Sequence, residues 1–129
     1  MELSERAKPL ANPELTRQIF KACEKAVNLK KLKRGANEAT KALNRDIAEI
    51  VVLAADATPL EIILHLPLLC EDKSVGYIFV PSMAELGQAC GTSRNVVSCV
   101  ITSRPGDNTM AEDIQDLKVK IEKCYYDWA

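Results

Sequence analysis

The sequence predicts an α/β protein whose helices cover both faces of a small, parallel or mixed sheet. Segments with apolar residues at helical spacing alternate with short runs of β-branched and aromatic residues, which is the pattern of a layered α/β fold. The 129 residues are 47% hydrophobic, enough for one core of ordinary size. We therefore expect one domain with roughly four strands and five helices, and no repeat indicates a solenoid.

The N-terminal part divides into an arm and a helix. Residues 1–11 carry mixed charge and few large apolar side chains, so we expect a flexible arm followed by one domain over residues 12–129. Asn12 and Pro13 predict a helix start, because asparagine caps helices and proline suits the first helical position. The apolar stripe of this helix is Leu15, Ile19, Cys23 and Val27.

The cationic run at residues 30–34, followed by a helix start, is the most distinctive stretch of the chain, and we expect its basic side chains to supply the free positive charge of a binding surface. A strand around Leu32, at most a short one, is expected before Gly35. The next apolar residues have helical spacing, so one face of this helix packs and the other is free to bind. Residues 28–45 hold six basic side chains and one acidic side chain, in a chain whose net charge is −1. The packed face is Ala36, Ala39 and Leu43, and the free face is Asn37, Lys41 and Asn44.

The middle of the chain predicts the central strand and a third helix. Residues 47–53 are rich in β-branched side chains and almost continuously apolar, as expected for a strand covered on both faces. Thr58, Pro59 and Glu61 form a capping-box pattern that predicts a helix start. We expect this helix to end near Pro67.

The C-terminal half continues the alternation. Residues 75–80 and 96–101 predict two further strands. Between them, Ser82 and Glu85 repeat the capping-box pattern before a short helix that Gly91 closes. A terminal amphipathic helix ending near Trp128 is predicted by the spacing of Met110, Ile114, Leu117 and Ile121.

Composition argues against several functional classes. The first nine residues contain no apolar signal region, and the most apolar stretch, residues 47–55, contains Glu49 and is too short to span a bilayer. We therefore expect a soluble, intracellular protein. The cysteines are odd in number and lack a C-x-x-C pair, which favours reduced, buried thiols and leaves no ligand set for structural zinc. They are Cys23, Cys70, Cys90, Cys99 and Cys124.

Two segments are candidates for binding nucleic acid. Asn37 and Glu38 have the donors and acceptors to contact base edges at a helix N-terminus that suits phosphate. Alternatively, Asn37 caps the helix and Glu38 only favours its first turn. Arg94, in a loop after Gly91, is suited to hold phosphate or stack on a base, or else is an ordinary exposed arginine. We expect this loop and the one at residues 56–58 to converge at the sheet edge that bears Gly35.

No set of residues in the sequence predicts a catalytic site. His65 lies among leucines and is expected to be packed and hydrogen-bonded, with no nucleophile to serve. Asp56 beside Thr58 more simply makes a turn and a cap than a catalytic pair. The glycines at 87 and 91 do not form a phosphate-binding loop, because the required G-x-x-x-x-G-K-[ST] string is absent.

Several strings of the chain resemble the ribosomal-type kink-turn-binding family, over roughly residues 13 to 124. Some are specific to the eukaryotic fifteen-kilodalton class that serves U4 snRNA and box C/D small nucleolar RNA particles. The resemblance implies a three-layer α-β-α sandwich with a small, mixed, four-stranded sheet. The strings are residues 35–41, 54–61, 65–73, 77–80 and 86–94.

The resemblance also implies a site and partners. The RNA is a kink-turn, an internal loop with tandem sheared G·A pairs and an extruded nucleotide. By position, Gly35, Asn37, Glu38 and Lys41 match residues that read the G·A pairs, and Lys33 and Arg34 match residues on the backbone. Residues that match or border the extruded-base site are Thr58, Ile62, Met83, Thr92, Ser93, Arg94 and Val97.

By the same resemblance, the protein is not an enzyme and needs no cofactor or metal. It is expected to be a monomer when free, away from membranes, in the nucleus and nucleolus. It would nucleate assembly of box C/D and U4 particles with Nop-domain proteins and, in the nucleolar particle, a fibrillarin-type methyltransferase. These particles act in rRNA 2′-O-methylation and processing and in pre-mRNA splicing.

This chain departs from the family pattern around the extruded base. Thr58, Met83 and Asn95 stand where this branch usually has glutamate, lysine and proline, and Pro81 replaces a usual basic residue. Base preference at that position is therefore open. Other readings are a ribosomal or box H/ACA kink-turn protein, a small enzyme, or a protein-binding adaptor of the same fold.

Overall fold

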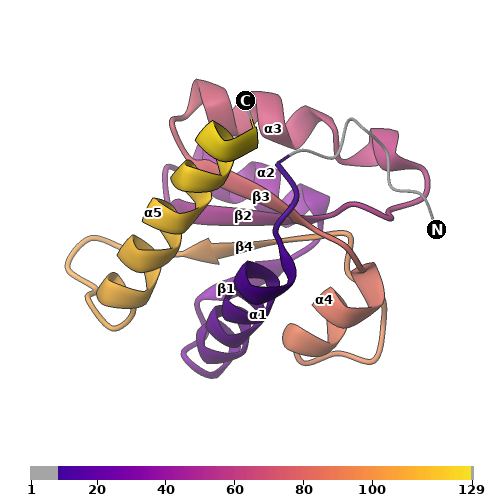
Figure 1. Cartoon of the computed structure of the whole chain (residues 1–129). Coiled ribbons are helices and arrows are strands. Elements are labelled where there is room, and N and C mark those ends of the chain that lie inside the picture. The colour runs from indigo at the N-terminus through magenta and orange to yellow at the C-terminus, as the bar shows by residue number, and fades with distance from the viewer. Residues whose placement is uncertain (1–8, 129) are drawn as a thin grey trace.

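A four-stranded mixed sheet lies between two layers of helices in the computed structural model, which describes residues 9–128 and side chains as far as Cys124 (Figure 1). The strands are β1 (Leu32–Arg34), β2 (Ala48–Ala54), β3 (Gly76–Val80) and β4 (Ser98–Thr102). Their order in the sheet is β1-β4-β2-β3. Strands β2 and β3 form a parallel pair, and β4 is antiparallel to both of its neighbours, β1 and β2. The predicted α/β sandwich with a mixed sheet is confirmed.

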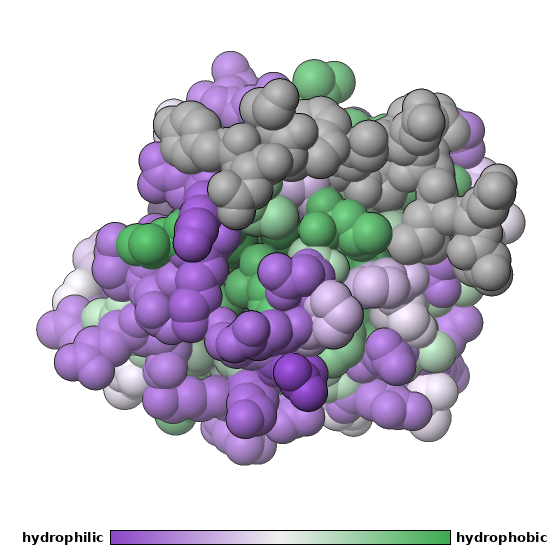
Figure 2. All heavy atoms as spheres, viewed as in Figure 1, coloured by the Kyte–Doolittle hydropathy of each residue, from purple (hydrophilic) through white to green (hydrophobic). Residues whose placement is uncertain are grey.

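The helices divide between the two faces of the sheet. The face that carries Ile50 and Val52 packs against α1 (Pro13–Asn28), α4 (Met83–Ala89) and α5 (Ala111–Trp128). The face that carries Val51 and Leu53 packs against α2 (Ala36–Asn44) and α3 (His65–Asp72). In the view of Figure 2, hydrophilic side chains cover most of the outer surface of α1 and α5, as expected for helices that bury only one stripe.

Strand β2 is the centre of the structure. It pairs with β4 on one side and β3 on the other, and its residues from Ile50 to Ala54 are all fully buried. Alternate side chains enter opposite core layers, so a strand with two covered faces needs a nearly continuous apolar run. The structure confirms this part of the prediction.

Two predicted helix caps are present. Asn12 Oδ1 accepts a hydrogen bond from the Leu15 N–H at 2.8 Å, and Ser82 Oγ accepts one from the Glu85 N–H at 3.2 Å. Each bond satisfies one N–H that has no partner inside its helix. Both helix starts therefore follow from side chains within three residues.

The last residues of the expected arm are held against the sheet. The Phe79 N–H donates to the Pro9 carbonyl at 2.9 Å, and the Ala11 N–H donates to the Phe79 carbonyl at 2.8 Å. Ala11 is also buried in the core. The expectation of a flexible arm over residues 1–8 lies outside the described residues.

The predicted capping box at Thr58 is wrong. The Thr58 hydroxyl donates to the Asp56 carbonyl at 3.2 Å instead of capping a helix, and Pro59 has an extended backbone (φ −74°, ψ 145°). Only a 3-10 turn, η1 (Leu60–Ile62), follows, and α3 begins at His65. Pro67 does not end this helix, because it lies in the first turn, where its missing N–H has no helical partner to lose.

His65 differs in part from the expectation. Its side chain is exposed rather than packed, because it lies at the start of α3 on the outer side of the helix. Its Nε2 lies 3.1 Å from Thr40 Oγ1, so the expected hydrogen bond is present. The histidine thus links α3 to α2.

The cysteines are thiols, and most of them are buried. Four are fully buried, Cys124 is half-buried, and none of the five forms a disulfide. Burial raises the pKa of the Cys70 thiol to about 12, which keeps it protonated. Within residues 9–128, no helix is long and apolar enough to cross a membrane, and no His, Cys, Asp or Glu cluster is arranged to hold a metal.

Candidate nucleic-acid interface

Most of the candidate binding segments meet at one end of the sheet. Because β2 and β3 are parallel and β4 is antiparallel to β1 and β2, the C-terminal ends of β1, β2 and β3 lie beside the N-terminal end of β4. The start of α2, residues 55–59, the start of α4 and residues 91–97 all join the sheet at this end. The predicted convergence of Gly35, the loop at residues 56–58 and the loop after Gly91 is confirmed, at the end of the strands rather than along an edge strand, and the start of α4 joins them.

Main-chain hydrogen bonds fix the first two segments to the start of β4. The Gly35 N–H donates to the Ser98 carbonyl at 2.8 Å, and the Ala54 N–H donates to the Val97 carbonyl at 2.8 Å. The carbonyls of two consecutive residues, Val97 and Ser98, therefore hold the end of β2 and the start of α2. The surface that they form has a rigid base.

Asp56 joins the remaining segments. Its Oδ1 accepts a hydrogen bond from the N–H of Met83 at 2.8 Å, and the Met83 carbonyl accepts one from the Val96 N–H at 3.0 Å. The loop after β2, the start of α4 and the loop before β4 thus form one connected unit. The sequence suggested only a turn for Asp56, because its partner lies 27 residues along the chain.

The start of α2 presents uncapped N–H groups. Gly35 occupies the N-cap with a φ of 101°, which favours glycine, and it has no side chain to bond the first-turn N–H groups. A Cβ built on Gly35 would have no atom of the described residues within 4 Å, so within this part of the chain the space above it is open. Asn37 is the second residue of the helix and exposed, so the alternative in which it caps α2 is excluded.

Glu38 and Lys41 form an ion pair on the surface of α2. The Lys41 Nζ lies 3.5 Å from Glu38 Oε1, and the two side chains are 59% and 40% exposed. Such a pair contributes only about 0.5 kcal/mol, so both side chains can be redirected to a ligand at small cost. Together with Asn37, they place an acceptor, a donor and an amide on one surface.

The cationic run is divided between surface and core. Lys33 and Arg34 on β1 are exposed, whereas only 8% of the Lys31 side chain is exposed. The Lys31 Nζ lies 2.6 Å from Asp107 Oδ2 and, together with donors from Thr109, lowers the pKa of Asp107 to about 2. The expectation that Lys31 adds to the free surface charge is wrong, because its partner arrives from the loop after β4.

The loop before β4 exposes the second group of candidates. Ser93 and Arg94 are exposed, and Thr92 and Val97 are half-buried. The Arg94 N–H donates to Thr92 Oγ1 at 3.2 Å, which holds the loop in a local turn. Val97 packs at the margin of the core that lies under α2 and α3.

Residues of η1 and its neighbours complete the surface. The apolar residue Ile62 is 47% exposed, and Thr58 is exposed. Met83 is half-buried at the first position of α4. The candidate interface therefore has a polar part on α2 and a partly apolar part that includes Ile62 and Val97.

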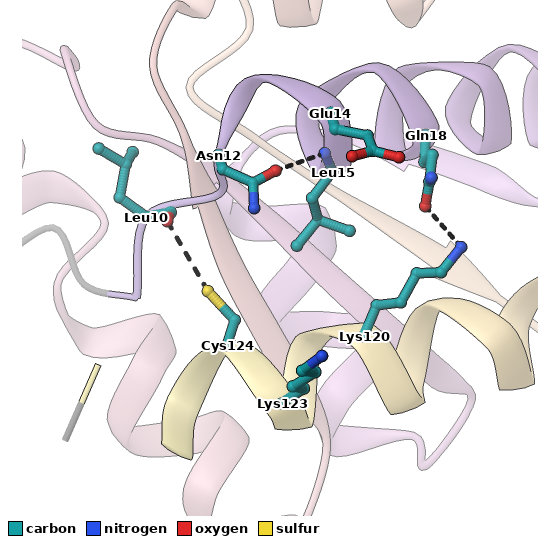
Figure 3. Close-up of a pocket in the computed structure, with 8 residues that line it drawn as sticks. All are labelled: Leu10, Asn12, Glu14, Leu15, Gln18, Lys120, Lys123 and Cys124. Atoms are coloured by element: carbon teal, nitrogen blue, oxygen red, sulfur yellow. Dashed lines mark hydrogen bonds between the residues drawn. The ribbon is translucent and has the colours of Figure 1, made fainter. Parts of the chain in front are cut away.

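A separate hollow of about 450 Å³ lies between the start of α1 and the end of α5 (Figure 3). Polar groups in its wall bond to one another: Lys120 Nζ donates to Gln18 Oε1 at 2.6 Å, and the Cys124 thiol donates to the Leu10 carbonyl at 3.8 Å. None of the sequence-predicted site residues lines this hollow. The candidate interface is an open surface elsewhere on the molecule.

Comparisons with known proteins relate the chain to one family and one fold. A family model described as "Ribosomal protein L7Ae/L30e/S12e/Gadd45 family" matches residues 17–112. "NHP2-like protein 1" of Xenopus tropicalis is 53% identical over 122 residues, covering 95% of this chain and 94% of that protein. "13 kDa ribonucleoprotein-associated protein" of Yarrowia lipolytica is 54% identical over 122 residues, covering 95% and 96%. A solved structure, "Giardia lamblia 15.5kD RNA binding protein", superposes with a TM-score of 0.90 at 40% identity, covering 95% of this chain and 99% of that one.

Proposed function

Because the chain belongs to the ribosomal protein L7Ae/L30e/S12e/Gadd45 family, we propose that it is an RNA-binding protein that recognises kink-turns. The observation that carries the proposal is the start of α2, where Asn37 and Glu38 stand at an uncapped helix N-terminus beside Lys33 and Arg34. The similar proteins from Giardia lamblia, an "RNA binding protein", and from Yarrowia lipolytica, a "ribonucleoprotein-associated protein", support it.

The start of α2 reads the tandem G·A pairs in this proposal. The Glu38 carboxylate accepts from the imino and amino hydrogens of guanine, donors that only guanine presents together. The amide of Asn37 both donates and accepts, so it suits a sheared pair. The free N–H groups and positive end of α2, with Lys41 one turn on, hold the adjacent phosphates.

The apolar part of the surface receives the extruded nucleotide. Ile62 and Val97 supply a wall against which an unstacked base packs, while the Arg94 guanidinium holds its phosphate or edge. Thr92 and Ser93 lie in the same loop, and Thr58 and Met83 border it. Since neither Thr58 nor Met83 carries a charge, we expect weak preference for one base at this position.

The biological setting follows from the same proposal. The protein binds box C/D small nucleolar RNA and U4 snRNA and nucleates their particles in the nucleolus and nucleus, for rRNA 2′-O-methylation and processing and for splicing. Nop-domain proteins, and in the nucleolar particle a fibrillarin-type methyltransferase, join the complex. The protein itself carries out no catalysis.

A panel of RNAs tests the proposal. Affinities are measured for kink-turns of the U4, box C/D and box H/ACA types and for a plain duplex of equal length, at one salt concentration, because phosphate contacts are salt-dependent. We expect the first two to bind tightest. Equal affinity for all four would overturn kink-turn recognition, and tighter binding to the box H/ACA type would reassign the particle.

A further inference from the structure

The main chain of the loop before β4 lies directly against Gly87, in the middle of α4. A Cβ built on Gly87 would be 2.1 Å from the Arg94 carbonyl oxygen and 3.1 Å from its carbon. Cβ atoms essentially never approach other atoms so closely, and a backbone carbonyl cannot rotate aside as a flexible side chain does. Any side chain at position 87 therefore has to displace the loop.

Hydrogen bonds on either side of this contact hold the loop to α4. The Thr92 N–H donates to the Gly87 carbonyl at 3.1 Å, and the Val96 N–H donates to the Met83 carbonyl at 3.0 Å. Arg94 lies between these two attachments, with its carbonyl oxygen next to the position that a Cβ of residue 87 would occupy. The loop thus runs along the helix, at a separation that only a residue without a side chain permits.

Helix formation does not account for a glycine at this position. Gly87 lies within the α-helical range of α4, and glycine is a poor helix former compared with alanine. Glycine at position 87 is explained by the close approach of another backbone, which only a residue without a side chain permits.

We propose that Gly87 is a positioning residue for RNA recognition: it sets where Arg94 and Val97 meet the extruded nucleotide, without touching RNA itself. This inference rests on the proposed function. A shift of the loop moves these two side chains away from the base. It leaves the start of α2 in place, because Gly35 is bonded to Ser98, which belongs to β4 and not to the loop.

The test compares Gly87→Ala with Gly76→Ala on two RNAs. Gly76 lies in β3, and a Cβ there meets only the Ile121 side chain at an ordinary 3.9 Å, so this variant is a matched control. One RNA is an intact kink-turn, and the other has an abasic site in place of the extruded nucleotide. The ratio of the two Kd values from one preparation cancels any loss of folded protein.

For wild type and Gly76→Ala, we expect the abasic RNA to bind about tenfold more weakly or worse, the loss of one stacked base. For Gly87→Ala, we expect weaker binding to the intact RNA and a ratio near one. A wild-type ratio in folded Gly87→Ala would overturn the inference. A failure of Gly87→Ala to fold would also overturn it, because the glycine would then serve the fold and not the site.

Amide hydrogen exchange of the free protein gives a readout that needs no RNA. In Gly87→Ala, the amides of Thr92 and Val96 should exchange faster while that of Gly35, which is bonded to Ser98 in β4, stays as protected as in wild type. Unchanged exchange at Thr92 and Val96 contradicts the inference. If wild type itself binds both RNAs equally, the proposed nucleotide site fails, and exchange alone decides whether Gly87 places the loop.

Discussion

Exchanging Glu38 for glutamine replaces one acceptor oxygen at the start of α2 with an N–H donor and leaves the shape of the side chain almost unchanged. In the proposed complex, both oxygens of Glu38 accept hydrogens from one guanine of the G·A tandem. The glutamine N–H then faces a guanine donor, and neither donor has an acceptor. We therefore expect Glu38→Gln to weaken kink-turn binding while the protein remains folded.

The structure separates the effect on binding from the effect on stability. Glu38 is 40% exposed and pairs with Lys41 at 3.5 Å, so losing this surface ion pair should change the free energy of unfolding by no more than about 0.5 kcal/mol. Leaving a buried donor unsatisfied in the complex costs about 1 to 3 kcal/mol. Binding should therefore weaken roughly 5- to 150-fold, with almost no change in melting temperature.

The assay is a double-mutant cycle between protein and RNA, measured by calorimetry. Replacing the guanine with inosine removes the amino group and keeps the rest of the base. Wild type should lose affinity for the inosine RNA, whereas Glu38→Gln should lose much less, because its clash with that amino group is relieved. Glu112→Gln, which changes another first-turn acid at the start of α5, serves as the control and should behave like wild type.

Equal losses with inosine for wild type and Glu38→Gln would refute the contact. Glu38 would then be a first-turn acid that supports α2, as one reading of the sequence allows.

Three further predictions follow from the charges and the apolar wall. Replacing Lys33 and Arg34 by alanine should flatten the slope of log affinity against log salt by up to about two units in binding titrations. Lys31→Ala should leave this slope unchanged and lower the melting temperature in thermal melts. An unchanged slope for the variant at Lys33 and Arg34 would place the RNA elsewhere. Val97→Asp should weaken binding roughly tenfold or more, because it sets an unpaired charge against base and phosphate, and it should also lower the melting temperature, because Val97 is half-buried at the margin of the core; wild-type affinity of the folded variant would remove Val97 from the site. The folded-state pKa of Asp107 is lowered from 3.8 to about 2, so its contribution to stability is present above about pH 4 and is lost as the pH falls toward 2. The melting temperatures of wild type and Asp107→Asn should therefore converge over that range. A constant difference between them would contradict the ion pair.

Local signals in the sequence were sufficient for much of the fold. The caps at Asn12 and Ser82 each depend on a bond to an N–H three residues away, and β2 depends on its own apolar run. These features are decided by neighbours along the chain. The capping-box pattern at Thr58 is also local, but its hydroxyl bonds back to Asp56 and the helix begins only at His65.

The remaining features depend on partners distant in sequence. Lys31 is buried because Asp107 reaches it from the loop after β4, and no pattern near Lys31 indicates that pairing. The sequence near Gly87 indicates no role for this glycine, because the group that requires it, the carbonyl of Arg94, comes from the following loop. The sequence named the residues of the candidate surface, whereas the antiparallel pairing of β4 with β1 and β2 brings their segments to one end of the sheet.

The most direct test of kink-turn recognition is one pair of Kd values for the wild-type protein. One RNA carries a kink-turn, and the other is identical in length and charge but has Watson–Crick G–C pairs in place of the tandem sheared G·A pairs. We expect the second RNA to bind at least about thirtyfold more weakly at the same salt, because the contacts of Asn37 and Glu38, each costing about 1 to 3 kcal/mol when broken, are lost together. Equal affinity for the two RNAs would show that only the phosphate backbone is bound, and would contradict recognition through the start of α2.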